Sequence, residues 1–85
     1  MMDLSPFTRA GLKLKEIGSI VGVSHTTAGL WMRGQRGVHY LLEERVHPIV
    51  AAVDNAVEDG KLPLPATVPR GERLDLIKDI VDQYR

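Results

Sequence analysis

The 85 residues suffice for one domain with a thin core, and 44% hydrophobic with 26% charged residues is an ordinary globular composition. Cysteine is absent, which excludes disulfides and thiolate metal sites, and the formal net charge is zero. No charged segment leads into an apolar core at the start of the chain, and the longest apolar run, residues 49–53, is far too short for a membrane span. We therefore expect a cytoplasmic protein with no membrane partner.

Charge is distributed unevenly along the chain. Residues 1–40 carry five basic and two acidic side chains, residues 41–60 carry one basic and five acidic, and residues 61–85 carry five basic and four acidic. No acidic residue lies between Glu16 and Glu43. A phosphate backbone can approach such a window without like-charge repulsion. The alternative is a neutral, glycine-rich turn region, but the window coincides with the motif described below and this favours the phosphate interpretation.

A short opening helix is predicted over residues 3–11. Ser5 can cap it, and Pro6 suits the first helical position, where no amide donor is needed. Phe7 and Ala10 are expected to face the core.

Two further short helices, separated by a tight turn, are predicted at roughly residues 13–21 and 25–33. Apolar residues spaced i, i+3, i+4 give the first of them one apolar face. Gly18 lies on that face, where a bulkier side chain would hold two crossing helices apart. Gly22 can turn the chain with a positive φ, and Ser24 is a natural N-cap for the second helix.

The second of these helices divides into an inner and an outer face. Ala28 and Trp31 are expected to face inward. The residues expected to face outward are Ser24, His25, Thr26, Gly29, Leu30 and Arg33. Glycine within a helix costs about 1 kcal/mol relative to alanine, so Gly29 indicates either a packing constraint or the close approach of a ligand.

The order of residue types in this stretch carries a family resemblance. From the first helix to the turn, the stretch has a small residue at 18, glycine at 22 and an apolar residue at 23. The second helix has an N-cap at 24, a small apolar residue at 28 and a large apolar residue at 31, and Arg-Gly follows at 33 and 34. This order resembles the helix-turn-helix of the lambdoid-phage repressor and Cro family, over roughly residues 5–59 when the flanking helices are included. That family usually has alanine where this chain has Gly18.

The resemblance implies an all-α domain of four to five helices that binds double-stranded DNA and regulates transcription, as a phage or prophage repressor or Cro-like protein. In that family the first turn of the second helix enters the major groove. Carried over position by position, the implied DNA-binding residues are Ser24, His25, Thr26, Thr27, Gly29, Leu30 and Arg33, with Gln35 and Arg36 in the following loop and Lys13 and Lys15 near the DNA backbone. The alternative for the two lysines is a solvated surface.

The base sequence that the helix reads cannot be carried over from the family. His25 and Thr26 stand where the family often has glutamine or asparagine. The His25 ring can donate to guanine O6 or accept from an exocyclic amine, and the Thr26 methyl can meet a thymine methyl. Arg33 is the strongest single candidate for a base or phosphate contact.

A fourth helix is predicted over residues 38–59, where apolar residues follow a helical period and Gly60 ends it. Pro48 removes one backbone hydrogen bond, so either one bent helix or two successive helices are expected. Its acidic residues should form a solvated face directed away from DNA, and they are Glu43, Glu44, Asp54, Glu58 and Asp59.

The rest of the chain follows the helix-turn-helix core expected over residues 1–60. Three prolines predict an extended strap at residues 61–69, and residues 70–85 read as an amphipathic C-terminal helix. Its apolar stripe can bury against its own domain or against a second copy, and we favour a homodimer because palindromic sites mirror two-fold symmetry. The expected dimer-interface residues are Leu74, Ile77, Ile80, Val81 and Tyr84.

No catalytic, metal or cofactor site is expected. His25, His39 and His47 are scattered along the chain, and no nucleophile-base arrangement can be recognised. The competing function is that of a protein-interaction adaptor, such as an antitoxin or the partner of an anti-repressor protein, with a structural helix-turn-helix. The zero net charge favours this alternative.

Overall fold

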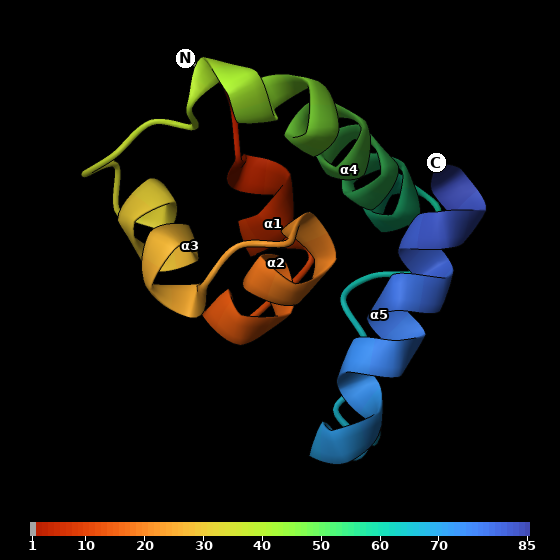
Figure 1. Cartoon of the computed structure of the whole chain (residues 1–85). Coiled ribbons are helices and arrows are strands. Elements are labelled where there is room, and N and C mark those ends of the chain that lie inside the picture. Colours follow the sequence, from red (N-terminus) through yellow and green to blue (C-terminus); the bar gives the residue numbers. More distant parts are fainter. Residues whose placement is uncertain (1) are drawn as a thin grey trace.

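The computed structural model describes residues 2–85, which form five α-helices and no strand (Figure 1). The helices are α1 (Ser5–Arg9), α2 (Leu14–Val21), α3 (His25–Met32), α4 (Tyr40–Glu58) and α5 (Arg70–Tyr84). The predicted all-α class is confirmed for these residues. Over the same range, no helix combines the length and the apolar character needed to cross a bilayer.

The core is arranged around α4. This helix packs against α1, α2 and α5, and α2 also touches α5. Its buried residues are Val46, Ile49, Val50, Ala52, Val53 and Ala56. From α1 and its C-terminal end, Phe7 and Ala10 are fully buried, as predicted. Burial of a phenylalanine side chain stabilises the fold by about 1.5–3 kcal/mol, so even the short α1 is held firmly.

The start of α1 differs from the prediction that Ser5 caps it. The N-cap residue is Leu4, whose side chain makes no capping bond, and Ser5 is already helical. The Asp3 carboxylate accepts a hydrogen bond from the Ser5 backbone N–H at 2.9 Å. Asp3 therefore satisfies the backbone amide of Ser5 itself, and the Ser5 side chain does not cap the helix.

Of the two alternatives for the fourth helix, the structure has one uninterrupted helix, with Pro48 inside it. Pro48 is exposed, so the carbonyl left without a donor one turn earlier can reach water. The His39 ring caps the helix by accepting from the Leu41 N–H at 3.2 Å. At the other end Gly60 has φ +77°, and the Lys61 N–H closes the last turn on the Ala56 carbonyl at 2.9 Å.

Residues 61–69 contain neither helix nor strand. Leu62 is buried and Leu64 packs half-buried against the core, so this segment is fastened to the domain. The Val68 N–H donates to the Pro65 carbonyl at 3.1 Å, which closes a turn just before α5.

The position of α5 buries two of the five residues expected at a dimer interface within the chain itself. Ile77 and Val81 are 0% and 3% exposed, because they cover the apolar side of α4 within the same chain. Ile80 and Tyr84 are half-buried against the same core, and the Tyr84 hydroxyl donates to Asp59 Oδ2 at 2.7 Å. Ile77 and Val81 are thus unavailable to a second copy, while Leu74 is half-buried at the start of the helix.

Candidate nucleic-acid interface

The turn between α2 and α3 forms as the sequence predicts. Gly22 has φ +89°, a left-handed conformation that glycine adopts without strain. Its N–H and that of Val23 both donate to the Gly18 carbonyl, at 2.7 and 2.9 Å, which ends α2. Ser24 then caps α3, since its Oγ accepts from the Thr27 N–H at 3.1 Å. The orientation of α3 relative to α2 is therefore fixed by local hydrogen bonds.

Gly18 is the point of closest approach between α2 and the chain that follows it. A Cβ atom at this position would lie 2.6 Å from the Val23 carbonyl oxygen and 3.3 Å from the carbonyl carbon of Ser24. The prediction that a bulkier residue would hold the two helices apart is confirmed, and the close contact is with the backbone of the turn. Alanine does not fit here unless the turn moves.

The helix α3 packs chiefly on α2, and in Figure 1 it lies at the opposite side of the molecule from α5. Ala28 and Trp31 point inward as predicted, with Trp31 5% exposed. Ser24, His25 and Thr26 are exposed at its N-terminal end. The first turn of α3 is therefore accessible to a large ligand.

Other expected contact residues are less accessible. Thr27 and Leu30 are half-buried, and the Thr27 hydroxyl accepts from Ser24 Oγ at 3.1 Å. Gly29 is buried, which corrects the expectation that it faces outward. A Cβ there would lie 3.3 Å from both Arg33 Nη1 and Leu14 Cδ1. The ends of the Arg33 and Leu14 side chains thus pack over Gly29, so a larger residue there requires both of them to shift slightly.

The loop after α3 presents three exposed polar side chains. They are Arg33, Gln35 and Arg36, and Arg33 Nε donates to Gln35 Oε1 at 3.4 Å. Both arginines lie in the window between Glu16 and Glu43 that contains no acidic residue.

Beside the N-terminal end of α3 is an open groove of about 740 Å³ between α2 and α5. It brings together Lys13 and Lys15, which were predicted to approach DNA, with His25. Arg70 and Leu74 line it from α5. Sequence reasoning missed Arg70, because nothing local to residue 70 indicates that α5 begins next to α2.

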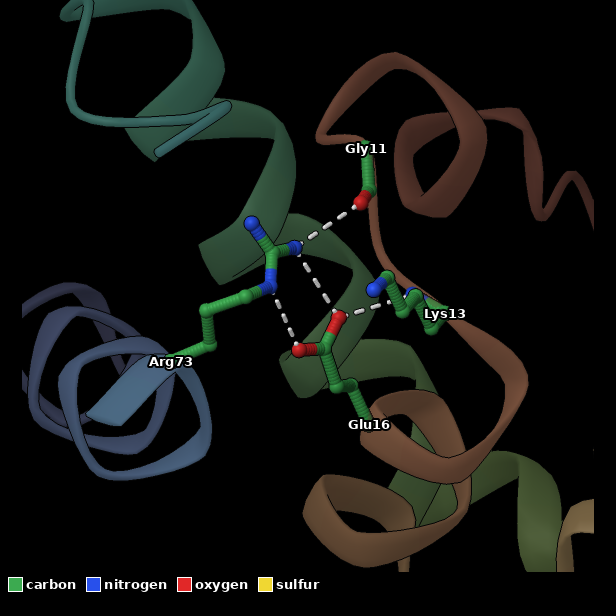
Figure 2. A network of polar contacts seen from close by, with 4 residues as sticks. All are labelled: Gly11, Lys13, Glu16 and Arg73. Atoms are coloured by element: carbon green, nitrogen blue, oxygen red, sulfur yellow. Dashed lines mark hydrogen bonds and ion pairs between the residues drawn. The ribbon is translucent and has the colours of Figure 1, made fainter. Parts of the chain in front are cut away.

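A polar network joins α5 to the start of α2 (Figure 2). Arg73 donates from Nε to Glu16 Oε2 at 2.9 Å and from Nη2 to Glu16 Oε1 at 3.1 Å. Its Nη2 also donates to the Gly11 carbonyl at 3.2 Å, and the Lys13 N–H donates to Glu16 Oε1 at 2.8 Å. A glutamate three residues after a helix N-cap is a sequence signal for this last bond, whereas the pairing with Arg73 has no such signal.

The electrostatics of this network follow from its burial. Glu16 is 8% exposed, and burial by itself would raise the pKa of its carboxyl. The hydrogen bonds from Arg73 and from the Lys13 N–H outweigh burial and hold that pKa below its ordinary value. Glu16 is therefore an ionised but neutralised carboxylate at the floor of a basic groove.

Among residues 2–85, no three histidine or acidic side chains gather in a way that could hold a metal ion. The chain matches no protein-family model, and neither curated proteins nor solved structures gave a match to it.

Proposed function

We propose that this chain is a double-stranded DNA-binding protein of the class that inserts a helix into the major groove, with α3 as the inserted helix. More particularly, we propose a transcriptional regulator of the phage repressor or Cro type. The observation that carries the proposal is the exposed first turn of α3, held at a fixed angle to α2 on an acid-free segment. Helix-turn-helix proteins present base-reading side chains from that turn.

The exposed side chains have the chemistry that base and phosphate recognition require. His25 and Thr26 offer hydrogen-bond donors and acceptors to base edges, and Arg33 adds a guanidinium about two turns later. Arg36 in the loop is a point of contact to phosphate, which carries no sequence information. On this proposal α2 and α3 form a helix-turn-helix, and residues 61–69 are the strap that returns α5 to the core.

We further propose that the protein reads two half-sites as a homodimer. Because Ile77 and Val81 are buried within the chain, a dimer contact made by α5 would use its outer surface, where Leu76 is 39% exposed. Light scattering at micromolar concentration tests this part separately. A dimer mass supports it, and a monomer mass in the presence of a two-half-site duplex excludes it.

Salt titration of duplex binding tests the DNA-binding function. Neutralised phosphates release counterions, so the affinity should fall steeply with salt, with a logarithmic slope of about −0.9 per phosphate contacted. Arg36→Ala should weaken binding to all sequences alike and make the slope shallower. Lys61→Ala is the matched control, since it removes one exposed cation at the far end of α4 and should leave the slope unchanged.

Base readout requires a different comparison. His25→Ala and Arg33→Ala should each weaken binding to the preferred sequence by about 1–3 kcal/mol while leaving binding to an unrelated duplex nearly unchanged. Equal losses on both duplexes would remove His25 and Arg33 from base readout.

A protein-interaction adaptor is the second candidate. Tyr40 and Leu41 are 72% and 70% exposed next to the loop that follows α3, and such adjacent apolar side chains favour a protein partner. An adaptor would bind duplex DNA weakly at every salt concentration, so the same titration separates the two functions.

A further inference from the structure

The groove between α2 and α5 collects basic side chains from the beginnings of three helices. Lys13 and Lys15 come from the start of α2, His25 from the first turn of α3, and Arg70 from the first residue of α5. We infer that this groove binds the sugar-phosphate backbone of duplex DNA and that Arg70 contacts a phosphate. The inference rests on the proposed function and extends the DNA interface to the C-terminal helix.

The groove is cationic because its acidic group is neutralised. Glu16 is the single acidic residue among the side chains that line the groove, and Arg73 donates to both of its oxygens. At about 100° per residue, Glu72 and Asp75 lie roughly 200° and 140° around α5 from Arg70, so they are directed away from the groove. Lys13, Lys15 and Arg70 are exposed and form no salt bridge within residues 2–85, although the charge of Lys13 is close enough to Glu16 to help lower the pKa of that carboxyl.

The DNA backbone is the expected ligand of the groove because of where the groove lies. His25 belongs both to the groove and to the turn of α3 that we propose to enter the major groove. A helix in the major groove has a phosphate backbone beside it, and the preceding helix of such motifs crosses that backbone. Leu14 and Leu74 add apolar surface to the lining of the groove, suited to contact with deoxyribose.

Arg73 is the positioning residue of this arrangement. It lies three residues after Arg70 on the same side of α5, and its bonds to Glu16 and Gly11 fix the start of α5 against α2. Arg70 is thereby held next to the lysines, although it lies 55 residues or more from them in the chain.

The test is duplex binding by the full chain as a function of salt for the native protein, Arg70→Ala, Arg73→Met and the double variant. Arg70→Ala should weaken binding about five- to tenfold near 0.1 M salt and reduce the magnitude of the slope by about 0.9. Arg73→Met should weaken binding in both backgrounds, because it leaves the Glu16 charge unpaired in the groove. The loss should be larger in the native background, where Arg70 is also released from its position, and an equal loss in both backgrounds would overturn the positioning role of Arg73. Circular dichroism of each variant shows whether the helices are retained, and Lys61→Ala again supplies the charge-matched control.

The possible outcomes distinguish failure of this inference from failure of the proposed DNA-binding function. If the native protein binds duplexes with a steep slope and Arg70→Ala has the same slope, the inference is overturned and the DNA-binding function stands. If the native protein shows no salt-dependent binding, both are overturned. If polyglutamate binds with a dependence on Arg70 that duplex DNA lacks, the groove is a site for an acidic protein and the inference is likewise overturned.

Discussion

Arg73 on α5 and Glu16 on α2, 57 residues apart in the chain, form a two-point ion pair in which both carboxylate oxygens accept from the guanidinium (Figure 2). The side chains are 16% and 10% exposed, so the pair is largely shielded from water. Such charge-assisted, two-point bonds fix orientation as well as distance. The pair therefore sets where α5 begins relative to the start of α2, which belongs to the proposed DNA interface.

Replacing Glu16 with glutamine should lower the free energy of unfolding by about 1–3 kcal/mol, because it removes a charged partner from a mostly buried guanidinium. Chemical denaturation measures this change. Glu44→Gln is the matched control, since Glu44 is exposed on α4 and should change stability by less than about 0.5 kcal/mol. Equal effects of the two substitutions would contradict a structural role for the pair.

The same pair should make stability depend on pH. The pKa of Glu16 is lower in the folded chain than its ordinary value of 4.5, so its contribution is fully present above about pH 4.5. That contribution is lost as the pH falls through the lower pKa of the folded state. The difference in unfolding free energy between the native protein and Glu16→Gln should therefore shrink as the pH is lowered from above 4.5 through the acidic range. A difference that stays constant over this range would show that the Glu16 charge is not what stabilises the contact.

Gly18→Ala should destabilise the domain by about 1–3 kcal/mol, although alanine is the better helix former. Its Cβ would meet the Val23 carbonyl oxygen at 2.6 Å, so the turn between α2 and α3 has to move. Gly71→Ala is the control within a helix, because a Cβ there meets nothing within 4 Å and should stabilise α5 by up to about 1 kcal/mol. Thermal unfolding of both variants gives the comparison, and a stabilised Gly18→Ala variant would show that the turn is not tightly packed.

Trp31→Ala should lower the unfolding free energy by about 3–5 kcal/mol, enough to loosen or unfold a domain of this size. The indole is 5% exposed and belongs to the core beneath α3, so its loss leaves a cavity under the proposed recognition helix. Tyr40→Ala removes an aromatic side chain that is 72% exposed and should cost far less. Comparable losses from both would mean that Trp31 does not anchor α3.

What the sequence predicts well is local. Gly22 and Ser24 act within four residues of the groups they satisfy, so their turn and cap follow from residue type alone. The burial of Gly29 depends on where the Arg33 side chain folds, which periodicity does not encode. The stripe with Ile77 and Val81 is equally suited to covering α4 or a second chain, and only the packed structure distinguishes the two.

The groove depends on contacts between residues that are still farther apart in the sequence. Arg70 and Lys13 line the same groove because the ion pair between Arg73 and Glu16 holds α5 against α2. No pattern in the sequence indicates that Arg73 and Glu16 pair. For this reason the sequence was enough to propose the lysines and His25 as DNA-facing residues. The contribution of Arg70 from α5 could be recognised only from the three-dimensional structure.

The most direct test of the central claim is selection of the full chain on a pool of random duplex DNA, run in parallel with His25→Ala. If α3 reads base edges in the major groove, the native protein should enrich a defined consensus, arranged as two symmetric half-sites for a dimer, and the variant should relax or lose it at one base position per half-site. A pool that shows no enrichment, or the same consensus from both proteins at equal affinity, would contradict the account.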